Sequence, residues 1–425
     1  MSEILSQPTP SYRYSVIAGD RLSSISSTAY GVQDYWKDIV SANPFLNDRH
    51  LQEDGSPTLY PGDILIIPEI IDTEPELENK LTGKAIDDLT IIIGDREIKV
   101  FYDSFLRTMD TGADGLKCST AWTPGLDKEL DELYLPFKFP KTEVYIGNDL
   151  QLTGYLYKVS PALSNSGSVI DLTIFSLTKD AVDSTVNPPY EKNNITLENR
   201  AKELLQPLGI RAVFEIDTGG QFDRITANQS DTIFRHLSEL SAQRNCLVSC
   251  TEKGELLFYQ PDTESEPVGT LKEGENFALS FAADYDGTKL FHTYRAVADT
   301  PGGDAQSSTA IDDNVPVSRS ITFQANDTTD GNIGKAAEHK RSKNYIDALT
   351  IPITVSGWIA PNGKIWEKNK TVILESPTLF LPNGVKMMIN QIEYILQDSG
   401  LSAVLSLIPV NVYNGEPIEY IWSVS

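Results

Sequence analysis

The chain has 425 residues and a mass of 47.0 kDa, which at roughly 100–200 residues per domain predicts two to four domains. Its 60 acidic residues outnumber 35 Lys and Arg, and the resulting net charge of −25 disfavours nucleic-acid binding and docking on anionic membranes, which both use clustered basic residues. No stretch approaches the ~20 apolar residues of a membrane span, and the N-terminus MSEILSQPTP lacks a signal-peptide pattern.

The first 69 residues predict a small unit with the order β-α-α-β. A short strand at 14–17 leads to Asp20, which is a suitable N-cap for the first helix. A second helix is expected from about residue 33, and a strand at 64–67 ends the unit.

The next part of the chain turns strongly β after a linker. Residues 70–86 are acidic and lack periodicity, which predicts an interdomain linker, and residues 87–190 contain successive hairpin patterns. Residues 191–265 predict a small α+β domain, with Thr196 and Ser230 as the caps of its two helices and a final hairpin.

The last region, residues 266–425, predicts a second β domain that includes a helix at 334–345. The stretch 299–316 has no core-forming residues and is expected to be a solvated loop. The tripeptide Pro-Asn-Gly occurs at 361–363 and 382–384 between strand patterns, and both copies predict turns.

Two hairpin patterns resemble each other. Residues 153–176 and 388–408 each consist of a strand, a short polar turn and an alternating strand, and another strand precedes each of them. Because hairpin patterns are common, this similarity alone leaves an internal duplication open.

Three cysteines are present, Cys118, Cys246 and Cys250, and an odd number does not indicate a disulfide framework. The last two fall in an alternating strand pattern and would lie about 13 Å apart at ~3.3 Å per residue. That separation is too long for a disulfide or for shared metal ligation. We expect small buried hydrophobic side chains in a reducing compartment.

The sequence has no recognisable catalytic or cofactor-binding pattern. The motifs HExxH, GxSxG, GxxxxGK[ST] and GxGxxG are absent, and His50, His236, His292 and His339 have no metal-ligand spacing. The segment 327–332 lacks the spacing of a calcium loop and predicts an ordinary turn and helix cap. We therefore expect no enzyme activity, no cofactor and no metal.

The first unit resembles the LysM domain. The residues that carry the resemblance are Tyr14, Val16, Gly19, Asp20, Leu22, Ile25, Tyr30, Gly31, Trp36, Ile39, Asn43, Leu59, Pro61, Gly62, Leu65, Ile67 and Pro68. A longer segment at 46–58 departs from the family pattern. The resemblance implies a contact turn for sugar or protein, formed by Gly19, Asp20, Arg21, Leu22 and Asn43.

Residues from about 88 to 412 resemble the baseplate hub protein of Mu-like contractile phages. Three stretches carry the resemblance: a hairpin segment at 152–186, a helical module at 198–261 and a C-terminal stretch at 317–410. The hairpin segment departs from the family pattern because Thr178–Asp183 lacks the expected glycine. The most family-like structural motif has the residues Trp358, Gly363, Trp366 and Asn369.

The resemblance implies a mainly β protein with α+β parts, similar to the T-even hub. Its expected domains are an N-terminal LysM-like domain (1–69), an acidic linker (70–86), a first hub β-barrel domain (87–190), a small α+β domain (191–265) and a second hub β-barrel domain with a helix and C-terminal strands (266–425).

The same resemblance implies a homotrimeric adaptor in a virion tail baseplate, synthesised in the bacterial host cytoplasm. It would join a hexameric tail tube to a trimeric central spike, and tape-measure protein and DNA would pass through it during genome ejection without specific DNA binding. The internal duplication is what such an adaptor would require. The acidity then suggests that carboxylates facing the channel keep it from holding DNA.

Other functions stay open at this point. The LysM-like unit could clamp neighbouring baseplate or sheath proteins, or it could bind peptidoglycan. A LysM-anchored cell-wall hydrolase is the alternative from the enzyme class, although catalytic spacings are missing. The same hub could also serve a contractile bacteriocin or another injection particle.

Overall fold

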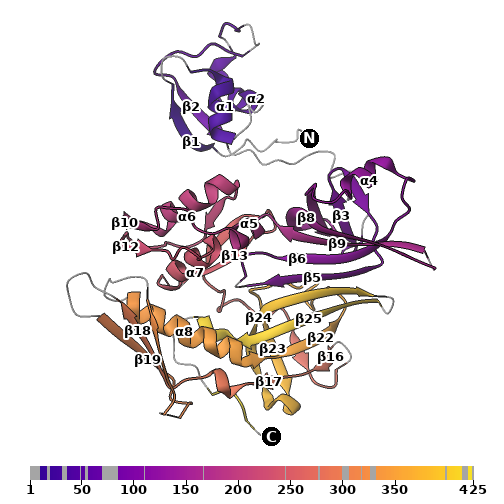
Figure 1. Cartoon of the computed structure of the whole chain (residues 1–425), viewed down its shortest axis with the longest axis vertical. Coiled ribbons are helices and arrows are strands. Elements are labelled where there is room, and N and C mark those ends of the chain that lie inside the picture. The colour runs from indigo at the N-terminus through magenta and orange to yellow at the C-terminus, as the bar shows by residue number, and fades with distance from the viewer. Residues whose placement is uncertain are drawn as a thin grey trace, which may run out of the picture. The chain divides into compact units, whose positions relative to one another are not determined.

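Figure 1 shows the chain as a computed structural model with two compact units, Met1–Thr82 and Gly83–Ser425. The structure describes residues 10–16, 20–30, 36–47, 49–52, 56–68, 85–109, 111–165, 167–244, 246–275, 278–298, 306–316, 318–325, 332–397, 400–413 and 420–423. Most of the predicted linker 70–86 lies outside these ranges. The predicted domain boundaries stay predictions.

The N-terminal unit has the predicted β-α-α-β order. Its elements are β1 (Pro10–Ser15), α1 (Leu22–Tyr30), α2 (Trp36–Ala42), the short 3-10 helix η1 (Pro44–Leu46) and β2 (Ile64–Pro68). Strands β1 and β2 pair antiparallel, with Tyr14 opposite Leu65. The core of the unit contains Leu22, Ile25 and Ile39, which come from its two helices. Its identification as a LysM domain stays a prediction.

The larger unit contains a mainly antiparallel sheet of 13 strands in the described part of the chain, which confirms a mainly β fold. The three cysteines are buried and free, as predicted. The strands of the sheet are β3 (Leu89–Ile93), β4 (Arg96–Ile98), β5 (Tyr102–Thr108), β6 (Gly115–Ala121), β7 (Lys141–Ile146), β8 (Asp149–Ser164), β9 (Gly167–Ser176), β15 (Thr270–Lys272), β16 (Ala278–Phe281), β22 (Pro352–Ser356), β23 (Thr371–Ser376), β24 (Leu381–Gln397) and β25 (Gly400–Pro409).

This sheet consists of two half-sheets with the same strand order. The first half-sheet runs β5-β6-β9-β8-β7-β3, and the second runs β16-β22-β25-β24-β23-β15. Corresponding strands also follow the same order along the chain. Corresponding neighbours pair antiparallel in both halves, except that β15 runs parallel to β23 whereas β3 runs antiparallel to β7. The regions predicted as two barrels therefore share one sheet.

The two long hairpins have the same pairing register. In β8–β9, Gly154 lies opposite Ser176, and in β24–β25, Met387 lies opposite Pro409, so both positions are shifted by 233 (387 − 154 and 409 − 176). The same shift relates the remaining pairs and the bulge in the first strand. The predicted similarity of the two hairpins is confirmed, and it extends to each pair of the ladder.

The half-sheets join where β5 pairs antiparallel with β24, from Asp103 opposite Leu396 to Thr108 opposite Gln391. Figure 1 shows β5 beside β24, although the two strands are far apart in sequence. Phe105 stacks on Tyr394 with ring centroids 5.7 Å apart and an interplanar angle of 24°. Apolar burial and an unbroken ladder thus fuse the halves into one core.

A small α+β region connects the half-sheets. Thr196 caps α6 as predicted, but the cap of α7 is Thr232 rather than Ser230, because the Thr232 side chain accepts a hydrogen bond from the Arg235 backbone N–H and its backbone is extended. The elements are α5 (Lys179–Asp183), β10 (Glu191–Ile195), α6 (Leu197–Leu205), η2 (Gln206–Leu208), β11 (Ala212–Phe214), β12 (Phe222–Thr226), α7 (Ile233–Ala242), β13 (Leu247–Cys250) and β14 (Leu256–Tyr259).

The prediction of a loop without core residues at 299–316 is wrong for 306–316, and 299–305 lie outside the described residues. Residues Gln306–Ile311 form β19, which pairs with β18, and Ala310 is buried. The core between this small sheet and α8 uses mostly alanines, and β19 contributes only Ala310 to it, so this strand lacks the large buried apolar residues that usually indicate a strand. Its elements are β18 (Thr293–Ala298), β19, β20 (Ser320–Gln324) and α8 (Asn332–Ala348).

The two Pro-Asn-Gly tripeptides behave differently. Residues 361–363 form the predicted turn, closed by a 2.9 Å hydrogen bond from Gly363 N to Ala360 O. Residues 382–384 lie inside β24, at an irregularity of its pairing with β23, so the prediction of a turn there is wrong. Gly384 has a φ of 71°, which explains how the strand accommodates the extra residues.

The remaining short elements complete the larger unit. They are α4 (Lys128–Leu133), β17 (Asp284–Tyr285), η3 (Gly287–Lys289), β21 (Leu349–Thr350), η4 (Pro377–Leu379) and η5 (Val410–Tyr413). Strand β17 pairs with β21, immediately beyond the pairing of β16 with β22.

Asp103, at one end of the junction between the half-sheets, makes the stability of the larger unit depend on pH. Its side chain is fully buried, and burial raises its pKa to about 7, against a smaller opposing effect of the Leu396 backbone N–H. An acid whose pKa is higher in the folded than in the unfolded state destabilises the fold progressively as the pH rises through this window. We therefore expect Asp103→Asn to stabilise the larger unit at high pH.

The expected gain is about 4 kcal/mol above pH 7 and about half of that at pH 5.5, from ~1.4 kcal/mol per pKa unit. Chemical denaturation at pH 8.5 and pH 5.5 measures it, with the exposed Asp223→Asn as the matched control. A gain that is the same at both pH values would contradict this account of Asp103.

Candidate functional site

The predicted contact turn of the N-terminal unit is partly described. Gly19 lies outside the described residues. Leu22 is fully buried, and Asn43 is buried with hydrogen bonds from Nδ2 to the Ile39 and Ile66 carbonyl oxygens, 2.7 Å each. These two side chains hold the fold of the unit. Asp20, which accepts a 3.0 Å hydrogen bond from the Tyr14 hydroxyl, and the exposed Arg21 are the described members with accessible atoms. The contact role of the turn stays a prediction.

The motif of Trp358, Gly363, Trp366 and Asn369 comes together beside the junction of the half-sheets. Trp358 is fully buried and donates from Nε1 to the Ser402 carbonyl at 3.0 Å. Its ring lies edge-on to Tyr394, whose hydroxyl donates to the Trp366 carbonyl. Asn369 has a φ of 62° and accepts a 2.9 Å hydrogen bond from Asp262 N. The motif therefore packs and connects strands.

A buried cluster of charged residues lies at the other end of the junction. Arg107 and Asp114 are 3 % and 2 % exposed, and Arg107 Nε donates to Asp114 Oδ2 at 3.0 Å. The same guanidinium donates to Gln151 Oε1 at 2.8 Å and to Glu252. Lys368 Nζ lies 3.2 Å from Asp114 Oδ2.

This cluster fastens the α+β region to the sheet. Lys368 Nζ donates to the Thr108 carbonyl at 3.0 Å and to Ser249 Oγ at 2.9 Å, so it joins β5 to β13. The Ser249 hydroxyl donates to the same Thr108 carbonyl at 3.1 Å. Buried charges are tolerated only where such partners satisfy them, and here Arg107, Asp114 and Lys368 each have several.

The cations of the cluster lower the pKa of the neighbouring carboxyl groups. Burial alone would raise the pKa of Asp114, but the neighbouring charges of Lys368 and Arg107 outweigh burial and hold this pKa below its usual range. Burial would likewise raise the pKa of Glu252, yet Arg107 lowers it. The carboxylates are thus ionised at neutral pH, and the cluster acts as a structural clamp.

The sequence carried one signal for this cluster that the prediction missed. Asp103, Phe105 and Arg107 occupy alternate positions of β5 and are all buried, so the period-2 pattern itself directs Arg107 into the core. Its partners Asp114, Glu252 and Lys368 come from separate segments, and no local pattern connects them.

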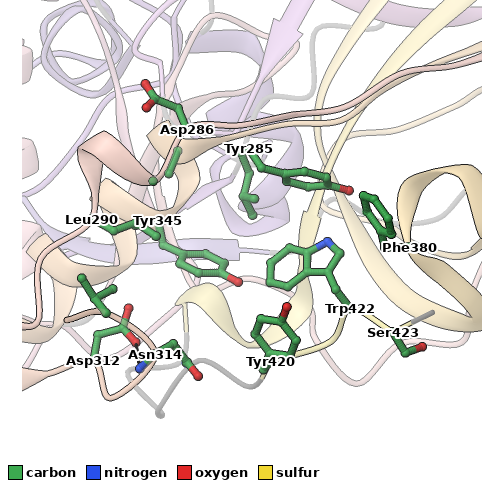
Figure 2. A pocket seen from close by; sticks show the side chains of 14 residues that line it. Tyr285, Asp286, Leu290, Asp312, Asn314, Tyr345, Phe380, Tyr420, Trp422 and Ser423 are labelled. Carbon is green, nitrogen blue, oxygen red and sulfur yellow. Dashed lines mark hydrogen bonds between the residues drawn. The ribbon is translucent and has the colours of Figure 1, made fainter.

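A cavity of about 710 Å³ lies between η3, the end of α8 and the C-terminal segment at 420–423. Figure 2 shows its aromatic side chains grouped around the hollow, with Trp422 close to Tyr285 and Tyr420. Its described aromatic lining residues are Tyr285, Tyr345, Phe380, Tyr420 and Trp422. An apolar wall with a few polar groups such as Asp286 and Asp312 is typical of a site that receives an apolar side chain or small molecule.

No group of three or more His, Cys, Asp or Glu side chains with the geometry of a metal site occurs among the described residues. His236 is fully buried beside Arg200, and burial followed by the charge of Arg200 lowers its pKa to about 4. Within the described ranges, no helix is both long and apolar enough to cross a membrane.

Two family models match parts of the larger unit. "Baseplate hub protein gp44-like, second domain" matches residues 178–260, and "Mu phage baseplate assembly protein GpP, fourth domain" matches residues 331–416. The first match covers the α+β region with Ser249 and Glu252, and the second covers α8 and β22 to β25. Both matches favour a structural role over an enzyme.

Solved structures with the same fold come from prophage and bacterial tail proteins. The prophage MuSo2 43 kDa tail protein from Shewanella oneidensis is 20% identical, with a TM-score of 0.65 over 76% of this chain and 99% of that chain. The tail protein from Neisseria meningitidis MC58 is 17% identical, with a TM-score of 0.66 over 77% of this chain and 98% of that chain. No curated protein matches the chain. The chain therefore resembles phage baseplate proteins in two of its regions and shares its fold with these tail proteins.

Because Asp114 neutralises two buried cations, Asp114→Ala should destabilise the larger unit by about 3–5 kcal/mol, the usual effect of leaving a buried charge unpaired. The free energy of unfolding in denaturant measures this loss. Asp223→Ala, at an exposed position of β12, is the control and should change stability by less than about 0.5 kcal/mol. Equal effects of the two substitutions would contradict a clamping role.

Proposed function

We propose that the chain is the baseplate hub of a contractile phage tail. Three copies would form an adaptor between a hexameric tail tube and a trimeric central spike, and the adaptor would form part of the channel for tape-measure protein and DNA. The observation that carries this proposal is the repetition of a half-sheet with the same strand order and the same hairpin register.

The repetition supports a change of symmetry within one molecule. Each chain carries two similar half-sheets, so a ring of three chains presents six similar units to a six-fold partner and three whole chains to a three-fold partner. Oligomers of this kind close by a rotation that repeats one contact around the ring. The resemblance to hub proteins and the fold shared with tail proteins favour this arrangement.

The net charge fits a channel that does not bind DNA. With −25 per chain, carboxylates within a screening length of ~8–10 Å from the channel would repel the DNA backbone. We infer that passage without specific binding is the role of this acidity.

The N-terminal unit is proposed as a LysM-like clamp for neighbouring baseplate or sheath proteins rather than as a peptidoglycan anchor. Two of its predicted contact residues, Leu22 and Asn43, are buried, which leaves a small accessible turn at Asp20 and Arg21. A contractile bacteriocin or another injection particle could use the same hub, and neighbouring genes distinguish these systems.

The native mass of the purified full chain tests the trimer. Native mass spectrometry, alone and with the cognate spike protein, should give a species at three times 47.0 kDa. A strict monomer in both samples would contradict the hub proposal. A peptidoglycan zymogram with the same protein should show no clearing, and clearing would favour the cell-wall hydrolase.

The clamp and the wall anchor differ in their response to sugar. Titration of the full chain with an N-acetylglucosamine hexamer should show no binding if the turn contacts protein. Saturable binding that Arg21→Ala abolishes and Lys37→Ala preserves would contradict the clamp and favour peptidoglycan. Lys37 is a matched control because it is an exposed cation on α2 of the same unit.

A further inference from the structure

Among the strand edges of the larger unit that have no neighbouring strand in the described residues are those of β8 and β16. Strand β8 pairs with β7 only up to Tyr155, so its segment 158–163 pairs with β9 on one side and with no strand on the other. Strand β16 lies at the end of the sheet, and β17, which continues it, pairs only with β21. Exposed edges of this length invite pairing with another chain.

The second half-sheet shows which strand can pair with an edge of this kind. In the second half-sheet, the counterpart of the β8 edge is β24, which is shifted by 233 positions. There the edge at 391–396 pairs with residues 103–108 of β5. The β8 edge therefore corresponds to a surface that is already filled by a strand elsewhere in the same molecule.

The counterpart of β5 in the second half-sheet is the continuous segment of β16 and β17. Ser119 of β6 lies opposite Asp171 of β9, and Thr354 of β22 lies opposite Val404 of β25, which is Asp171 shifted by 233, so Ser119 corresponds to Thr354. Their partners on the other side are Tyr102 of β5 and Ser280 of β16, which therefore also correspond. Residues 103–108 thus correspond to residues 281–286, with a shift of 178 (280 − 102). The pair of Asp284 and Thr350 keeps this correspondence, since it matches Leu106 and Gly115.

We propose that the β8 edge of one copy of this chain pairs antiparallel with the β16–β17 edge of a second copy. This contact between copies would repeat the β5–β24 junction found within each chain. Transferring that register predicts six opposed pairs: Lys158 with Asp286, Val159 with Tyr285, Ser160 with Asp284, Pro161 with Ala283, Ala162 with Ala282 and Leu163 with Phe281.

The side chains on the two edges are compatible with this pairing. Lys158 falls opposite Asp286, so a cation meets an anion, and Leu163 falls opposite Phe281. Leu163 is 83 % exposed in the single chain, an unusual environment for a leucine on a strand. Pro161 has no backbone N–H, so the ladder between copies would lack the hydrogen bond that another residue could donate at this position.

Each chain has one edge of each kind, so the contact is head-to-tail and a rotation closes it into a ring. This inference deepens the proposed homotrimer and rests on it, because it names the strands that join the three copies. Half-sheets would then alternate around the ring through two similar junctions, one within each chain and one between chains.

Disulfide trapping in the full chain tests the register. Adjacent opposed pairs alternate between hydrogen-bonded and non-hydrogen-bonded geometry, so the double variants Ala162→Cys/Ala282→Cys and Leu163→Cys/Phe281→Cys sample both. At least one should form covalent dimers and trimers on mild oxidation, as seen by denaturing gel electrophoresis. The native cysteines should not interfere, since they are buried and burial raises the pKa of each thiol.

Two double-cysteine variants serve as controls for the register. The variant Ser104→Cys/Ile395→Cys is the counterpart of the first pair within one chain and should form an intrachain disulfide. The variant Ala162→Cys/Asp284→Cys is two residues out of register and should trap at least tenfold less. Leu163→Asp should lower the trimer fraction in native mass spectrometry, whereas Leu126→Asp should not, because Leu126 is similarly exposed at 82 % but belongs to neither edge strand.

The outcomes distinguish the strand pairing between copies from the homotrimeric hub. A wild-type trimer in which neither in-register pair cross-links overturns the strand pairing and leaves the hub proposal standing. Equal cross-linking in and out of register, or a trimer unaffected by Leu163→Asp, also overturns it. A wild-type chain that stays monomeric with its spike overturns both.

Discussion

The antiparallel pairing of β5 with β24 is the constraint on which the larger unit depends. It joins segments nearly 300 residues apart (396 − 103 = 293 for its most distant pair) and turns two half-sheets into one core. Phe105 and Tyr394 supply the apolar centre of this junction, and Trp358 closes it from the side. The charged cluster around Asp114 fixes the end next to the α+β region, so displacing β5 would disturb the sheet, the α+β region and the loop at Lys368 together.

The junction also suggests how the proposed trimer would present one fold to partners of two symmetries. Because the two halves keep the same strand order, the surface that joins them within a chain has a counterpart that each chain still offers at β8. A protein that uses one type of contact both inside and between copies needs little additional surface to close a ring. The small sheet with α8, inserted between β16 and β22, distinguishes the second half from the first without changing this plan.

Much of the secondary structure could be predicted from local patterns. The turn at Gly94-Asp95, the Thr196 cap and the hairpin of β13 and β14 follow from a few adjacent residues, and the structure contains each of them. The prediction failed where tertiary packing decides the outcome. Strand β19 contains small residues because alanines pack beneath α8, and Pro382-Asn383-Gly384 forms an irregular strand because β23 pairs on both sides of it.

The candidate site was harder to predict than the fold. The motif of Trp358 and Trp366 could be selected from the sequence, but its role in packing around Tyr394 required the junction. The cluster of Arg107, Asp114, Glu252 and Lys368 combines four separate segments and has no local signature. The matching register of the two hairpins could be suspected from the sequence but established only from the ladders.

The central claim is that three chains form a ring of six similar half-sheets. An electron cryo-microscopy reconstruction of the assembled tail tip tests it most directly, because it counts the copies and traces the strands between them. The account predicts three copies, with each β8 edge paired to the β16–β17 edge of its neighbour. Six copies, or three copies whose sheets do not meet at these edges, would contradict it.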